Sequence, residues 1–225
     1  MARGDRGRDS LARAKGKGRR RREVYIYTEG EDTEPYYLDI IAKHGVYEDP
    51  GLQVVIHIQE RHRKNDRKPL DMVAKAADLM RDKTREAKRD ELKKELLPQV
   101  WCVFDHDNYP YLAKAMKQAK AAGVEVAFSH PCFEVWRLAH YRAVSGNFSG
   151  VCDLVADRLP FARGSADAKN PKIVLPHQVL GRYETAKKNA ERMNAQHGDH
   201  VQKIDRDPYT DVFKLVEKGL GITTY

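Results

Sequence analysis

The sequence predicts an α/β fold: a mainly parallel four-stranded sheet flanked by helices and followed by a helical C-terminal extension. Short apolar runs alternate along the chain with longer segments whose apolar residues recur at helical spacing. Strands that are joined through helices form right-handed crossovers and pair in parallel. With 225 residues, of which 41% are hydrophobic, the chain can bury one core and a small appendage.

The expected strands are short apolar runs. One of them, "QVWCVF", is apolar throughout, as expected of a strand that is buried on both faces. Prolines near the starts of helical segments and glycines after their ends mark several boundaries. We expect strands over residues 24–27, 54–58, 99–104 and 124–128. We expect helices over residues 33–44, 70–95, 111–123, 132–141, 183–198 and 207–221.

Three parts of the chain are distinguished by composition. Residues 1–22 are expected to form a disordered basic arm, residues 23–145 the core, and residues 146–225 an extension that packs on it. The arm carries ten Lys or Arg residues against two acids, and it accounts for the whole formal net charge of +8. High charge density with few hydrophobic residues is typical of disordered segments.

The basic arm is a candidate for nucleic-acid contact, because Lys and Arg neutralise backbone phosphates without reading sequence. The alternative is a solubilising terminus that binds nothing specific. A second basic loop over residues 61–68 could guide nucleic acid or simply be solvated. The four arginines next to the first strand are the expected contacts: Arg19, Arg20, Arg21 and Arg22.

Several classes of protein are excluded by what the sequence lacks. No apolar stretch approaches the roughly 18 residues needed to span a bilayer, and the N-terminus lacks the apolar segment of a secretory signal, so we expect a cytoplasmic protein without a membrane partner. The cysteines Cys102, Cys132 and Cys152 show no close-paired spacing, which predicts neither a disulfide nor a zinc site but small core residues. No P-loop motif is present.

Acidic residues follow two of the expected strands. Glu29 comes after the first strand, while Asp105 and Asp107 in "VFDHDN" come after the third. Residues two apart in an extended segment project in the same direction, so the two aspartates are expected to converge. Glu29 would join them if the two strands are neighbours, because ligands gather at the carboxyl ends of parallel strands.

This arrangement predicts a site for a hard divalent cation, which favours a few carboxylates with water completing the shell. Crowded like charges are unfavourable without such a cation. Each motif also has a plainer interpretation. The aspartate pair could be turn chemistry, and the acids before residue 33 could cap the helix that follows.

Four separated segments of the chain resemble one family. They are "VYIYTEGEDTEPYYLDII", "VWCVFDHDN", "SHPCFEVWRLAHY" and "DPYTDVFKLVEKGL". Together they resemble the RloB family, also called AbiLii-like, from about residue 20 to near the C-terminus. The order of a Glu-Gly after one strand and an Asp-x-Asp after a later one is similar to the Toprim domain of topoisomerases, primases and OLD-family nucleases.

The resemblance implies a Toprim-like, Rossmann-like fold and a role for each acid. Glu29 would act as general acid or base, and Asp105 and Asp107 would hold one or two Mg or Mn ions. Glu134 of "PCFE" would be a further ligand, with Glu29 also close enough to contribute. Glu31 and Glu34 are additional acidic candidates. Arg137 and His140 would contact phosphate or a carboxylate of the site. The alternative is that Arg137 forms an ion pair and His140 packs in the core.

The resemblance also implies a biological setting. A metal-dependent nuclease of a bacterial anti-phage or abortive-infection system is expected, working with an AAA-type or ABC-type ATPase partner on DNA or RNA. The alternative is a non-catalytic accessory subunit of such an ATPase complex that binds nucleic acid or a nucleotide effector. A third interpretation is a DNA-organising factor that acts through the basic arm.

Overall fold

A computed structural model describes residues 20–59, 68–161 and 172–225. Arg19 and most of the second basic loop lie outside these ranges. The central sheet has five strands in the order β3-β1-β4-β5-β6, four of them parallel and β6 antiparallel to β5. Its strands are β1 (Arg20–Thr28), β3 (Leu52–Ile58), β4 (Gln99–Asp105), β5 (Glu125–His130) and β6 (Tyr209–Thr210).

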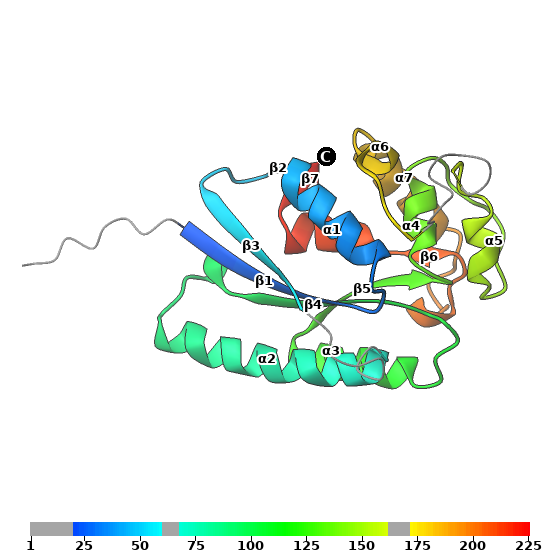
Figure 1. Ribbon diagram of the computed structural model, residues 1–225. Helices are drawn as coiled ribbons and strands as arrows, with labels where there is room; N and C mark the ends of the chain where they lie inside the picture. Colours follow the sequence, from blue (N-terminus) through cyan, green and yellow to red (C-terminus); the bar gives the residue numbers. More distant parts are fainter. Residues whose placement is uncertain (1–19, 60–67, 162–171) are drawn as a thin grey trace, which may run out of the picture.

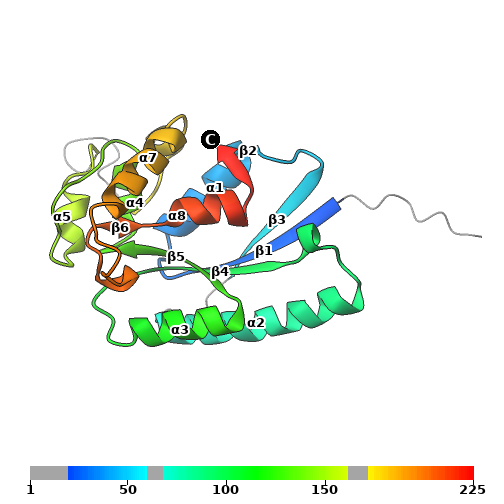
Figure 2. The same ribbon diagram turned by 180° about the vertical axis from the view of Figure 1, so that it is seen from behind.

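Helices cover both faces of the sheet, giving three layers (Figure 1). On one face lie α2 (Pro69–Arg89) and α3 (Leu112–Ala122), and Figure 2 shows the same two helices from behind. On the other face lie α1 (Thr33–His44), α4 (Glu134–Ala139), α6 (Pro176–Val179), α7 (Tyr183–Asn194) and α8 (Val212–Lys214), with α5 (Cys152–Ala156) at the edge. The mainly parallel sheet flanked by helices agrees with the prediction.

The side chains of β4 explain why this strand lies at the centre. Val100, Cys102 and Phe104 pack into the core beneath α2 and α3, whereas Trp101 and Val103 pack into the core beneath α1 and α4. All five are at most 2% exposed. Since successive side chains of a strand point to opposite faces, a run that is apolar throughout requires apolar partners on both sides.

The chain reverses its winding direction between β1 and β4. From β1 it leads through α1 to β3 on one side, and from β4 through α3 to β5 on the other. The two helices lie on opposite faces of the sheet. Where the winding direction reverses, a crevice forms outside the carboxyl ends of the two neighbouring strands. Ligands of open α/β sheets bind in this crevice.

The C-terminal segment differs from the expected single helix over residues 207–221. The chain first adds β6 to the edge of the sheet, and then forms the short α8 and a π-helical turn, η5 (Leu215–Gly219). It ends in β7 (Ile222–Thr224), which pairs antiparallel with β2 (Val46–Tyr47). Strands of two or three residues are too short to show an alternating pattern, so the four-strand expectation missed them.

Other boundaries shifted by smaller amounts. The helix expected over residues 70–95 ends at Arg89, and residues 94–96 form the 3₁₀ turn η2 (Lys94–Leu96). A second 3₁₀ turn, η4 (Lys203–Asp205), precedes β6. Gly123 ends α3 with φ 70°, a left-handed conformation that glycine adopts without strain. No helix within the described ranges is long and apolar enough to cross a membrane.

The expectation for the cysteines was wrong. Cys132 and Cys152 form a disulfide, with Cα atoms 5.7 Å apart, whereas Cys102 is a free, buried core residue as expected. The bond joins the residues just before α4 to the first residue of α5. The separation of 20 positions between the two cysteines gave no spacing signal, because only the fold brings α5 back onto the start of α4.

Candidate carboxylate site

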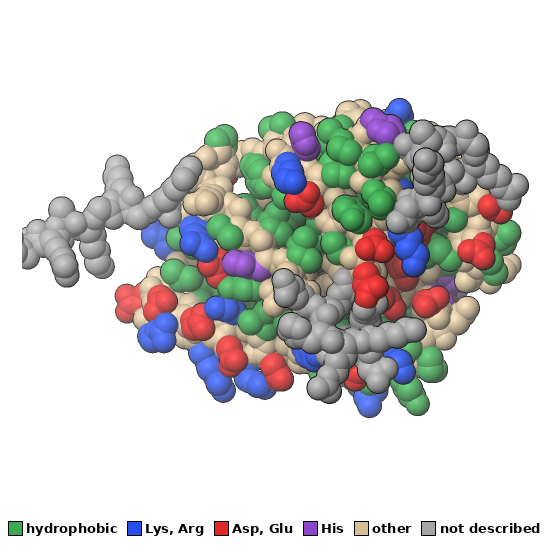
Figure 3. Space-filling model, viewed as in Figure 1, with side chains coloured by type: hydrophobic (Ala, Val, Ile, Leu, Met, Phe, Trp, Pro, Cys, Tyr) green, Lys and Arg blue, Asp and Glu red, His purple; other side chains and the backbone are tan. Residues whose placement is uncertain are grey.

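Acidic side chains line a cleft of about 330 Å³ outside the carboxyl ends of β1 and β4. Figure 3 shows acidic side chains gathered on this face, beside the carboxyl end of β1. Among the residues described there, Lys172 is the one basic lining residue. The acidic lining residues are Glu29, Glu31, Asp32, Glu34, Asp105, Asp107 and Glu134.

Glu29 joins the two central strands. It directly follows β1, and its backbone N–H donates to the carbonyl of Val103 in β4 at 2.9 Å. Its carboxylate Oε2 accepts a hydrogen bond from the backbone N–H of Asp105, also at 2.9 Å. The expectation that Glu29 and Asp105 lie together if their strands are neighbours is therefore met, since β1 pairs with β4.

Asp105 is the last residue of β4, and its carboxylate is buried among other carboxylates. Its Oδ1 is closed off from solvent and has no hydrogen-bond partner among the residues that the structure describes. Burial raises the pKa of Asp105 well above its ordinary value, and the neighbouring carboxylates of Glu34, Glu29 and Glu134 raise it further. A hydrogen bond from the backbone of Phe133 opposes this in part. A buried carboxylate in this setting favours a proton or a cation.

Asp107 reaches the cleft by a different route from the one expected. The strand ends at Asp105, and Asp107 lies in a turn with φ 37°. Alternation along an extended segment therefore does not explain why both aspartates line the same cleft; the turn does. Asp107 is exposed, so it faces the solvent side of the cleft.

Glu34 folds back from α1 toward the end of β1. Its side chain is buried, and its Oε1 accepts a hydrogen bond from the backbone N–H of Gly30 at 2.9 Å. A Cβ at position 30 would lie 1.8 Å from Glu34 Oε2, so glycine at this position leaves the space that the carboxylate occupies. Glu31 also lines the cleft but is exposed.

Glu134 and Arg137 lie on one side of α4. Glu134 Oε1 is 3.7 Å from Arg137 Nη1, and Glu134 Oε2 is 3.5 Å from the Sγ atom of Cys152. Arg137 is 2% exposed, and its Nη2 donates to Gln178 Oε1 at 3.2 Å. The guanidinium does not line the cleft itself, and it acts on the site through the carboxylate of Glu134.

His140 lies in the core rather than in the cleft. Its Nδ1 contacts the Trp136 carbonyl and its Nε2 contacts the Tyr225 hydroxyl, both at 2.9 Å. The Tyr225 hydroxyl in turn contacts that of Tyr37 at 2.8 Å. Burial lowers the pKa of His140 to about 4. His140 was expected either to contact phosphate or a carboxylate or to pack in the core, and it packs in the core.

The carboxylates line one cleft, but their oxygens are not drawn to a single point. Within the described ranges, one group of three ligand side chains has ligand atoms all within 4.8 Å of one another, and it consists of Cys132, Glu134 and Cys152. Sequence reasoning had placed neither cysteine in the site. Because like charges repel, carboxylates without a cation are expected to stand apart.

The arginines expected to contact nucleic acid lie at the opposite end of β1. Arg20, Arg21 and Arg22 belong to the strand itself, so the expected boundary between arm and core at residue 22 falls inside β1. Arg20 is the first of the nine residues of β1 and Glu29 directly follows the last, so the two lie roughly 30 Å apart at about 3.3 Å per residue.

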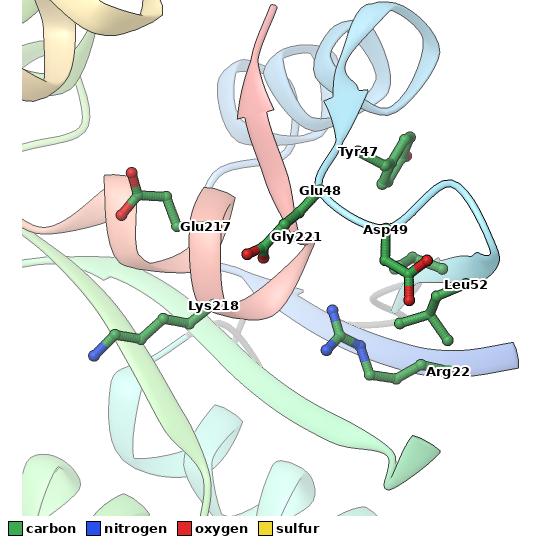
Figure 4. Close-up of a pocket in the computed structure, with 9 residues that line it drawn as sticks. Arg22, Tyr47, Glu48, Asp49, Leu52, Glu217, Lys218 and Gly221 are labelled. Atoms are coloured by element: carbon green, nitrogen blue, oxygen red, sulfur yellow. The ribbon is translucent and has the colours of Figure 1, made fainter. Parts of the chain in front are cut away.

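Each of these three arginines has a partner within the chain. Arg20 pairs with Asp49 and Arg21 with Glu23, both at 2.8 Å, and Arg22 donates to the Gly219 carbonyl at 3.0 Å. Figure 4 shows the Arg22 guanidinium directed into a second cleft, which Glu48 and Asp49 also border. A surface in which arginines alternate with carboxylates is a weak attractor for phosphate.

Comparison with known proteins identifies the family. The model of a family described as RloB-like protein matches residues 24–218, which include every carboxylate of the cleft, both bonded cysteines and the C-terminal segment as far as η5. No curated protein and no solved structure matches the chain. The chain belongs to the RloB-like protein family.

Proposed function

We propose that the carboxylate cleft holds one or two divalent cations, Mg or Mn, and hydrolyses phosphodiester bonds in nucleic acid, as in Toprim-type nucleases. One observation carries this proposal: the buried Asp105 Oδ1 has no partner in the described part of the chain and is surrounded by three further carboxylates. A native fold does not ordinarily retain an orphaned buried oxygen amid like charges. A hard cation would satisfy both the oxygen and the charge.

The residues fit a hard cation by their chemistry. Asp105, Asp107 and Glu134 would hold it, with Glu29 as a further ligand, since all four line the cleft and offer only carboxylate oxygens. When bound, such a cation polarises a phosphoryl oxygen and offsets the charge that develops on it.

The remaining chemistry belongs to Glu29. Its Oε2 accepts a hydrogen bond from the Asp105 backbone N–H, which orients the carboxylate that would take a proton from an attacking water. The water oxygen forms the new bond to phosphorus, the bond to the leaving sugar oxygen breaks, and that oxygen takes up a proton from solvent. The hydrogen bond from the Gly30 backbone N–H holds the buried carboxylate of Glu34 at the side of the cleft next to Glu29.

The proposal is tested with the purified full-length chain on single-stranded DNA, double-stranded DNA and RNA. We expect cleavage of at least one substrate with Mg²⁺ or Mn²⁺ and none with EDTA, because the carboxylates supply no electrophile of their own. Absence of cleavage of all three substrates under cation concentrations that saturate the protein would remove the nuclease proposal.

A second candidate function is favoured by the composition of the cleft. Lys172 is its one basic lining residue in the described ranges, whereas nucleic-acid binding depends on several Lys or Arg contacts to phosphate. The cleft would then bind a metal-linked nucleotide effector as an accessory subunit of an AAA-type or ABC-type ATPase. Cation binding without cleavage, together with co-purification of such an ATPase, would support this function. In either case we propose a role in bacterial defence against phage.

The basic arm is tested separately. Replacing the seven Lys and Arg residues within residues 1–19 by Gln keeps the chain length and leaves β1 intact, since the strand begins at Arg20. We expect nucleic-acid affinity at low salt to fall about tenfold or more and its salt dependence to flatten, because each lost phosphate contact removes about 0.9 from the slope. Fluorescence anisotropy over a salt series measures both. An unchanged slope would exclude the arm from binding.

A further inference from the structure

Two sulfur atoms and one carboxylate border the cleft beside the cation-binding carboxylates. Cys132 and Cys152 are bonded to each other, and the Sγ atom of Cys152 is 3.5 Å from Glu134 Oε2. The two Sγ atoms and a carboxylate oxygen of Glu134 all lie within 4.8 Å of one another. The three side chains come from the residues before α4, the start of α4 and the start of α5.

Ligand chemistry separates this group from the rest of the cleft. Thiolates are soft ligands that select Zn²⁺, whereas carboxylates alone suit Mg²⁺ or Mn²⁺. A metal binds the thiolate form of cysteine, so sulfurs joined in a disulfide cannot serve as thiolate ligands. The same three side chains are therefore closed to zinc when the bond is formed and open to it when the bond is reduced.

We propose that reduction of the Cys132–Cys152 bond creates a Zn²⁺ site formed by two thiolates and Glu134, with the fourth position open to water. A dithiol reductant supplies two electrons and two protons, which convert the disulfide to two thiols, and is itself oxidised to a disulfide. Zn²⁺ then displaces the two thiol protons to solvent and binds the thiolates.

The position of the site supports access and selectivity. Both cysteines line the same cleft as the acidic residues, so a cation that enters it reaches the sulfurs directly. Cys152 is half-buried and lines the cleft, from which a reductant would approach the bond, while Cys132 is 5% exposed. Arg137 contacts the second oxygen of Glu134 at 3.7 Å and so holds this carboxylate beside the sulfurs.

The zinc site would share Glu134 with the proposed nuclease centre. Zinc bound to the reduced chain withdraws this carboxylate from Asp105 and Asp107, so the redox state of the bond selects which cation occupies the cleft. This last step rests on the proposed function, whereas zinc binding by the reduced chain does not.

The test is zinc binding by the full chain, measured by competition with a chromophoric chelator after reduction and desalting without oxygen. We expect one tightly bound Zn²⁺ per reduced chain, and binding by the oxidised chain, which has only carboxylate ligands, at least 100-fold weaker. Cys132→Ser and Cys152→Ser should lower the affinity of the reduced chain at least 100-fold, and Glu134→Gln about tenfold or more. Cys102→Ser is the matched control, because Cys102 is a free cysteine in the opposite core and should leave zinc binding unchanged.

Cobalt provides a second readout of the ligands. Co²⁺ added to the reduced chain should give a thiolate-to-cobalt charge-transfer band that is absent from the oxidised chain. The comparison of oxidised with reduced wild type needs no substitution, so it stands even where a cysteine variant fails to fold. A reduced chain that binds no zinc, or binds it equally well when oxidised, would overturn the proposal.

The two proposals fail separately. Zinc binding by the reduced chain without Mg²⁺-dependent cleavage by the oxidised chain would leave the zinc site and remove the nuclease. Cleavage without zinc binding would do the reverse.

Discussion

Asp105→Asn is expected to lower the rate of divalent-cation-dependent cleavage by about 10³-fold or more, equivalent to about 4 kcal/mol of transition-state stabilisation. Asp105 lines the cleft, its backbone N–H donates to Glu29 Oε2, and its buried carboxylate neighbours other carboxylates. Asparagine has nearly the same shape but carries no charge, so the variant removes one of the proposed carboxylate ligands of the cation. Cleavage rates over an Mn²⁺ series measure the effect.

Asp78→Asn is the matched control for this substitution. Asp78 lies on α2, outside the cleft, where its exposed side chain pairs with Arg81. The control should retain the wild-type rate within about twofold, since exposed ion pairs contribute less than about 1 kcal/mol. Equal activity of Asp105→Asn and wild type would show that cleavage does not depend on this cleft.

Asp105→Asn is also expected to change the stability of the protein, and in opposite ways without and with a cation. Without a cation, we expect Asp105→Asn to unfold at or above the temperature of the wild type, because it removes a buried, raised-pKa carboxylate from three like charges. With Mn²⁺ at 100 times its Kd, the wild type should gain about 2.7 kcal/mol and the variant almost nothing. Differential scanning fluorimetry measures the unfolding temperatures. Simple damage to the fold would lower the unfolding temperature of the variant below that of the wild type both without and with Mn²⁺.

His140 is expected to make the fold acid-sensitive. Burial lowers the pKa of His140 to about 4 in the native state, against about 6.5 in an unfolded chain. The unfolded state therefore binds the proton more readily, and the free energy of unfolding decreases as pH falls from about 6.5 to 4. A difference of 2.5 pKa units corresponds to a loss of about 3 kcal/mol, which is complete below pH 4.

His140→Gln should flatten this part of the stability profile, because glutamine does not titrate. Urea unfolding at half-unit steps between pH 4 and 7.5 gives the slope, which is independent of any constant loss from repacking. His44→Gln is the control, since His44 is exposed at the end of α1. A His140→Gln slope equal to that of the wild type would assign the acid sensitivity to other groups.

The sequence predicted the layers of the fold well and its edges poorly. The run "QVWCVF" required apolar partners on both faces, and β4 is buried as expected. The edge strand β6 has two residues and pairs with a strand about 80 residues earlier in the chain, so its existence depends on a long-range contact rather than on local pattern. The disulfide was missed for the same reason.

By itself, the sequence determined which residue types follow the strands: a glutamate after β1, an aspartate at the end of β4 and a second aspartate two residues later. It could not determine that β1 and β4 are neighbours, because a run of apolar residues specifies burial but not a partner. Tertiary structure placed Glu29 against Asp105 across 76 residues and Cys152 beside Glu134. It also placed Arg20, Arg21 and Arg22 at the far end of β1, because an extended strand separates what the sequence sets close together.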